Sequence, residues 1–319
     1  MSVARVAGMP DYSSGGGTTG SFFIPEIWST KLIEKWYDST ILTHISNTNY
    51  EGEIKNQGDT VWIRTRGSVP WHTYEKGQIL SPPDRIESPR IKLVIDKGKY
   101  AYFGIDDIDK YQSDIDLMGQ WAEDALEQEK IDLDTEVLAW ISANASTTNK
   151  GVAAGRISGA YNLGASTTPV ELTSANILKY ILMAGGCLGE NNVPQGGWFL
   201  AMPEAAAVLL RDSDVKDASM MGDSQSTLRS GRLGRLGNFT LYSSNLLPSV
   251  ADPTTGQLCF DMIFGHPYGI TYASQFLETD HIDKPETTFG KFIKTLHVYG
   301  YEMIKPTAVG VLYATVVWT

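Results

Sequence analysis

Two strand-like runs are joined by a long connection that carries large apolar side chains, and this feature restricts most strongly what the chain can fold into. The runs span residues 60–65 and 91–95, and the second continues through residues 100–103. Their connection, 66–89, is too long for an ordinary turn, and loops of that size are usually functional or disordered. Four prolines interrupt it, and it carries the large apolar residues Trp71, Tyr74, Ile79 and Leu80. We therefore expect a long hairpin whose exposed apolar end lies on a partner.

Composition indicates an ordinary globular protein with an acidic balance. Of 319 residues, 42% are hydrophobic and 20% are charged, which is enough to form a core in one large domain or two modest ones. The formal net charge of −11 argues against a protein whose main task is to grip nucleic acid, because affinity for phosphates comes from Lys and Arg.

Targeting and redox signals are weak. No standard signal peptide and no run of 18 apolar residues occurs, so we expect neither secretion nor a membrane span. Cys187 and Cys259 stand far apart in apolar sequence, which predicts buried free thiols.

The first half of the chain contains two predicted helices. Residues 1–22 are rich in Gly, Ser and Thr and predict a flexible arm, and an amphipathic helix is expected to begin near Pro25. Apolar residues at spacings of three and four predict one long helix over 106–143, with a break near Gly119. Its other face is acidic and is predicted to be exposed to solvent. A metal-binding carboxylate cluster is disfavoured, because the sequence has no Glu-x-x-His motif to complete it. The acidic residues are Asp114, Asp116, Glu123, Asp124, Glu127, Glu129, Asp132, Asp134 and Glu136.

The remaining sequence predicts a mixed α/β segment followed by strands. Helices are expected over 174–188 and 203–210, with strands at 198–202 and 239–242 and a polar loop over 212–230. Alternating residues then predict strands at 258–264, 269–273, 292–301 and 309–318. The fold class is α+β.

No catalytic motif, cofactor-binding motif or metal-binding motif is present in the sequence. The five histidines stand alone, and Asp212, Asp214 and Asp217 lack the remainder of a calcium loop. Arg229, Arg232 and Arg235 alternate with glycines, which is compatible with an anion or nucleic-acid contact. A second interpretation is a tight backbone path whose arginines pair with acids of neighbouring subunits.

Taken in order, these pieces resemble the major capsid proteins of tailed bacteriophages with the HK97-like fold. Four phrases carry the resemblance, in addition to Ser244 and Asn245 that follow the last of them. They are 23–28 (FIPEIW), 58–61 (GDTV), 104–109 (GIDDID) and 234–242 (GRLGNFTLY).

The resemblance implies an HK97-like capsid fold divided into five parts. These are an N-terminal arm with a short helix (1–48), an extended β-hairpin loop (49–105), a peripheral domain with the long spine helix (106–150), an axial domain (151–275), and C-terminal strands that return to the peripheral domain (276–319).

It also implies a function in assembly. The chain would form pentamers and hexamers of an icosahedral head that encloses double-stranded DNA, in a virion assembled in the bacterial host cytoplasm. Implied inter-subunit residues in the extended loop are Val69, Pro70, Trp71, His72, Tyr74 and Lys76, and those in the axial loop are Arg211, Asp214, Lys216, Arg229 and Arg232.

Implied partners are further copies of the chain, a portal and a separate scaffolding protein, because only about twenty residues precede the first element. A decoration protein is also compatible with the resemblance to capsid proteins. Packaged DNA would contact the acidic helix only weakly and without sequence specificity. No cofactor, metal, catalytic residue or membrane is implied.

Two alternatives stay open at this point. An encapsulin-like compartment shell shares the fold, although no feature identifies a cargo. A hydrolase with paired carboxylates fits the size and the many acids, but it would not need the apolar hairpin.

Overall fold

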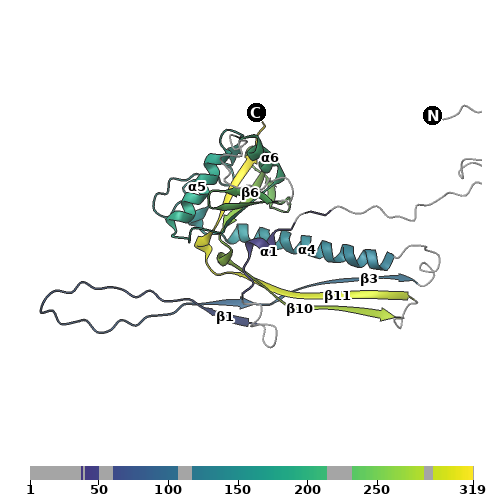
Figure 1. Ribbon diagram of the computed structural model, residues 1–319, viewed down its shortest axis with the longest axis horizontal. Coiled ribbons are helices and arrows are strands. Elements are labelled where there is room, and N and C mark those ends of the chain that lie inside the picture. The colour runs from purple at the N-terminus through teal and green to yellow at the C-terminus, as the bar shows by residue number, and fades with distance from the viewer. Residues whose placement is uncertain are drawn as a thin grey trace, which may run out of the picture.

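Three parts of the molecule are distinct in space (Figure 1). The structure is a computed structural model that describes residues 37–38, 40–49, 60–106, 117–213, 232–283 and 290–318. A mixed α/β unit lies at the top of the view with the C-terminus, a long helix lies over a narrow sheet below it, and a hairpin projects to the left. The helix expected from Pro25 lies outside the described residues.

The α/β unit is built on a seven-stranded mixed sheet. Its strand order is β4-β12-β9-β5-β7-β6, and β8 pairs with β9. The strands are β4 (Val170–Leu172), β5 (Trp198–Met202), β6 (Arg232–Leu236), β7 (Phe239–Ser243), β8 (Ser249–Ala251), β9 (Leu258–Gly265) and β12 (Val309–Val316). The helices α5 (Ile177–Glu190) and α6 (Glu204–Asp212) cover one face, and short 3₁₀ turns lie at Thr147–Asn149, Pro267–Gly269 and Pro306–Ala308.

Both faces of this sheet are covered, as its central strand shows. All five residues of β5 are buried. Trp198, Leu200 and Met202 belong to the core shared with α5 and α6. Phe199 and Ala201 point the other way, into a second core that contains the long helix. The alternation follows from the two-residue period of a strand, so one apolar run serves two cores.

The long helix α4 (Leu117–Asn144) lies between the two sheets. The second sheet has three antiparallel strands in the order β10 (Ile270–Asp283), β11 (Gly290–Met303) and β3 (Lys97–Asp106). Leu133, Val137, Leu138 and Ile141 of the helix are buried in the second core. These positions fall at helical spacing in the C-terminal half, so the apolar anchoring of α4 is concentrated there.

A buried carboxylate ties the chain before α4 to that helix. The Asp134 carboxylate accepts hydrogen bonds from the backbone N–H groups of Ile41 (2.5 Å) and Leu42 (3.2 Å), at the start of the short helix α1 (Leu42–Ile45). These N–H groups have no intrahelical acceptor, so the carboxylate replaces one. Burial raises the pKa of Asp134, although the two N–H donors oppose this shift.

The hairpin is anchored by a small core of its own. Strands β1 (Thr60–Arg64) and β2 (Arg90–Val94) pair in antiparallel register with Ile63 opposite Ile91. Ile63, Leu93 and Ile95 pack with Ala273 and Ile304. Three partly buried apolar residues pack around this core: Val61, Ile91 and Val298.

Gly300 is the point at which the hairpin passes over the three-stranded sheet. A Cβ atom at Gly300 would overlap the carbonyl oxygen of Val94 and would lie 2.9 Å from the Cα atom of Ile95. Both neighbours are backbone, so a larger residue has no side chain to displace. This close approach fixes where the hairpin leaves the sheet.

Two predicted boundaries are wrong. The run through residues 100–103 was expected to extend the hairpin, but β3 leaves β1 and pairs with β11 from Lys97 onward. Residues 276–319 were expected to return together to the peripheral unit, but β12 lies in the seven-stranded sheet between β4 and β9. Its first four residues are all buried, which is typical of a central strand covered on both faces.

The prediction of a solvated acidic face on the long helix is wrong for part of that face. Asp134 is 3% exposed, and Glu136 accepts hydrogen bonds from the hydroxyl groups of Tyr299 (2.8 Å) and Tyr301 (3.0 Å). Glu129 lies beside His297 of β11. Because α4 has packed neighbours on two sides, a polar stripe on it is partly interior.

Several other sequence predictions are confirmed. The helices at 174–188 and 203–210 correspond to α5 and α6, and the strands at 198–202 and 239–242 correspond to β5 and β7. The glycine-rich path into residue 239 is also present, with φ of 96° at Gly234 and 58° at Gly237. Cys187 and Cys259 are buried and free.

We expect Gly300→Ala to lower the free energy of unfolding by about 1–3 kcal/mol, because the new methyl group overlaps fixed backbone. Urea unfolding of the purified chain measures this. Gly98→Ala on the adjacent strand β3 is the matched control, since its Cβ atom would find its nearest neighbour at 3.8 Å. An equal effect of both substitutions would contradict the crossing at Gly300.

Asp134 gives a prediction that depends on pH. A carboxyl whose pKa is raised by folding stabilises the fold below its ordinary value of 3.8, and this contribution is lost as the pH rises through the folded value. Asp134→Asn keeps an acceptor without charge, so its stability relative to wild type should increase over that rise. Asp134→Ala should cost about 1–3 kcal/mol at neutral pH, because two N–H groups lose their acceptor. Unfolding curves at several pH values test both, and a constant difference between wild type and Asp134→Asn would refute the pH effect.

Candidate assembly surfaces

The extended loop, defined as residues 65–89, has paired backbone only at its two ends. At its base, the N–H and hydroxyl groups of Thr65 both donate to the carbonyl oxygen of Pro89, at 3.0 and 2.7 Å. At its tip, Gly77 has φ of 90° and the N–H of Gln78 donates to Glu75 at 3.0 Å. Between these points the arms lack a strand ladder. Prolines 70, 82, 83 and 89 explain this, because proline has no N–H to donate.

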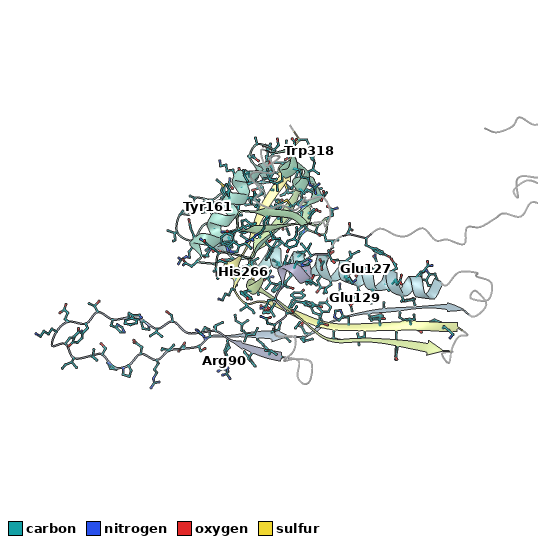
Figure 2. The ribbon with its side chains drawn as sticks, viewed as in Figure 1. Arg90, Glu127, Glu129, Tyr161, His266 and Trp318 are labelled. Atoms are coloured by element: carbon teal, nitrogen blue, oxygen red, sulfur yellow. The ribbon has the colours of Figure 1, made fainter. Side chains whose placement is uncertain are left out.

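Large apolar side chains of the extended loop are exposed. Trp71 is 96% exposed, Ile79 is 92% exposed and Leu80 is 76% exposed. Figure 2 shows the side chains of the loop beyond Arg90 with no other described part of the chain beside them. A single chain thus leaves the tryptophan of this loop in water, where burial would be favourable.

All the predicted loop residues lie on this surface. The exposed set is Val69, Pro70, Trp71, His72, Tyr74 and Lys76. His72 Nε2 lies 2.7 Å from the Asp84 carboxylate, which joins the two arms. Near the base, a Cβ atom at Gly67 would overlap the carbonyl oxygen of Glu87, so the arms also approach closely there.

The predicted axial-loop residues are described only in part. Arg211, on α6, pairs with Glu204 at 2.9 Å, and Glu204 also accepts a hydrogen bond from Ser243. Arg232 is the first residue of β6. Asp214, Lys216 and Arg229 lie outside the described residues, as does the side chain of Arg232.

A second exposed apolar surface was missed by the sequence analysis. Tyr100 is 81% exposed, and Tyr102 stacks on Phe292 with ring centroids 5.6 Å apart. Together with Leu296 they form the outer sheet face, on the side of the three-stranded sheet away from α4, around a hollow of about 380 Å³. The alternation of Tyr100 and Tyr102 with Ala101 was a signal, but it does not reveal which face stays open.

Two titratable groups, Glu136 and Cys187, serve packing. Burial by itself would raise the pKa of Glu136, but hydrogen bonds from the two tyrosines and a lysine outweigh it and lower the pKa. Burial raises the pKa of the Cys187 thiol to about 12, which suppresses the reactive thiolate.

Two other kinds of site are absent from the described residues. Within the residues that the structure covers, no group of three or more His, Cys, Asp or Glu side chains is placed to hold a metal ion. None of the helices described is long and apolar enough to cross a membrane.

Comparisons with known proteins identify the fold. No family model matches the chain, and no curated protein sequence matches it. Among solved structures, it is similar to a chain of Mycobacterium phage Che8, with 25% identity and a TM-score of 0.71 over 91% of this chain and 96% of the other.

Two further structures share the fold at lower identity. A chain from the capsid of cyanophage P-SCSP1u is 14% identical, with a TM-score of 0.69 over 94% of this chain and 96% of that one. A chain from the mature capsid of bacteriophage PhiM1 is 14% identical, with a TM-score of 0.61 over 98% and 99%. The fold expected from the resemblance is confirmed: the chain shares the HK97-like fold of these phage capsid chains.

Proposed function

We propose that this chain is the major capsid protein of a phage head, a structural protein that assembles with further copies of itself into a shell. The observation that carries the proposal is the extended loop, whose apolar side chains are exposed in the single chain. The match to capsid chains along nearly the whole length supports it. Two carboxylates of the long helix, those of Asp134 and Glu136, are occupied by structural hydrogen bonds, which argues against the hydrolase alternative.

The extended loop is proposed to lie on a neighbouring subunit. Trp71 would be its main anchor, because a buried aromatic residue contributes more than most interface residues. Val69, Pro70, His72, Tyr74 and Lys76 would surround it.

The axial contacts are proposed from the family resemblance. Arg211, Asp214, Lys216, Arg229 and Arg232 would approach a symmetry axis, where arginines can pair with acids of the next subunit. The acidic net charge of −11 supplies many such acids.

Finer features of the assembly extend the same proposal. Pentamers and hexamers would close an icosahedral shell around double-stranded DNA, which would touch the acidic protein weakly and without sequence preference. A scaffolding protein and a portal are proposed partners, and a decoration protein is compatible with the outer surface. We keep the five-part division of the chain as a proposal, with its boundaries moved so that β3 joins the peripheral part and β12 joins the axial part.

Trp71→Ala should impair assembly without weakening the single chain. Loss of a buried aromatic anchor from each contact should raise the concentration needed for assembly by about tenfold or more. The free energy of unfolding of unassembled protein should change by less than about 0.5 kcal/mol, because the side chain is 96% exposed. Light scattering and electron microscopy across a concentration series measure the first, and urea unfolding measures the second.

Two controls separate assembly from folding. Trp71→Phe should recover part of the assembly, since it keeps an aromatic ring. Leu93→Ala should lower the free energy of unfolding by about 2–5 kcal/mol, because Leu93 is fully buried at the base of the same hairpin. Normal assembly of Trp71→Ala at wild-type concentrations would overturn the proposed role of the loop.

A further inference from the structure

The N-terminal half of α4 meets the three-stranded sheet across a seam that is poor in apolar packing. From Gly119 to Asp132, no apolar side chain of the helix is buried, whereas the following turns supply Leu133 and Val137. A cavity of about 210 Å³ lies in this seam, between Ala122 and Ala125 of the helix and Ala101 and Phe103 of β3. Contacts other than packing must therefore hold this half of the helix to the sheet.

A histidine and a carboxylate face each other inside the seam. His297 Nδ1, from β11, lies within ion-pair distance of Glu129 Oε1, and Figure 2 shows Glu129 on α4 above the sheet. The two side chains are only 13% and 20% exposed. Both atoms are buried, and neither has a hydrogen-bond partner elsewhere in the described part of the chain. The other ring nitrogen, Nε2, lies 2.7 Å from Ser274 Oγ and 3.5 Å from the Tyr272 hydroxyl on β10.

The charges across the seam balance only when this histidine is protonated. The helix contributes three carboxylates, Glu129, Asp132 and Glu136. The sheet contributes Lys97 and Lys99, which lie 3.3–3.9 Å from Glu136 and Asp132. Two ammonium groups therefore face three carboxylates, and the imidazolium would be the third cation.

One neighbouring side chain, Lys99, opposes the protonation of His297. Lys99 is the direct cross-strand partner of His297, and like charges at such positions repel. Lys99 is engaged by Asp132 and Glu136, so its charge is partly compensated. The remaining neighbours do not add charge: Ser274 is neutral, as are Tyr272 and Tyr299 around the ring.

We propose that this seam is a pH-dependent clamp, in which protonation of His297 fastens the N-terminal half of α4 to the three-stranded sheet through Glu129. A neutral imidazole can donate from Nδ1 to Glu129 while Nε2 accepts from Ser274. The imidazolium donates from both nitrogens and places a positive charge beside the carboxylate, which adds electrostatic attraction to the hydrogen bond.

The clamp acts on one half of the helix only. The C-terminal half stays fixed by Leu133, Val137, Leu138 and Ile141 in the second core. Loss of the proton as the pH rises would release residues 119–132 without unfolding the α/β unit. These contacts all lie within a single chain, so the inference stands independently of the proposed function.

Hydrogen–deuterium exchange of the full unassembled chain tests the clamp between pH 5.5 and pH 8, the range in which imidazoles commonly titrate. After correction for the intrinsic pH dependence of exchange, protection of residues 119–132 should be about fivefold higher at the acid end in wild type. His297→Gln should abolish this difference. Residues 133–144 serve as the internal reference and should not change.

Two further variants keep the test decisive. His72→Gln removes the histidine of another His–carboxylate contact, in the exposed extended loop, and should leave the clamp intact. Glu129→Gln keeps the size of the side chain but removes its charge, so it should also abolish the pH dependence, and it replaces His297→Gln if that variant does not fold. Unchanged protection of wild type across the range, or an equal response in Glu129→Gln, would overturn the proposal.

Discussion

The structure depends on one constraint: the chain carries large apolar side chains that no other described part of the chain buries. Trp71 and Ile79 lie almost fully in water at the far part of a hairpin whose prolines prevent a regular ladder. Burying such surface is the main favourable term in protein association, which is why we propose that further copies of the chain cover it. The rest of the fold serves to hold this loop at a defined place. The small core around Leu93 and the close crossing at Gly300 both act at its base.

The long helix links the parts of the molecule in two different ways. Its C-terminal half is embedded in apolar packing shared by both sheets, and this half makes the framework rigid. Its N-terminal half is held by polar contacts beside a cavity, among them Glu129 with His297. Apolar burial changes little with pH, whereas ionic contacts change when one partner titrates. One continuous helix thus joins a fixed region to a region whose attachment depends on charge.

Local patterns in the sequence predicted the elements and their order. The exposed hairpin, the long helix and the strand at residues 198–202 are all present, because periodicity and proline placement act locally. The pairing between distant strands was harder to predict from the sequence. β3 and β12 were assigned to the wrong sheets, because the residue pattern of a strand does not indicate which other strand it pairs with. The prediction that the acidic residues of the helix are solvated was wrong in part for a related reason. A polar stripe reports which residues share a face, but Asp134 finds its donors 92 and 93 residues away. The axial candidates Asp214, Lys216 and Arg229 remain predictions.

The central claim is that other copies of the chain cover the loop that one copy leaves exposed. Hydroxyl-radical footprinting of Trp71 in unassembled protein and in purified shells measures this directly, because oxidation of an indole follows its exposure to solvent. We predict that Trp71 reacts readily in the unassembled chain and is strongly protected in the shell, while Trp198, which is buried in the α/β unit, stays protected in both. Equal reactivity of Trp71 in both states would contradict the account.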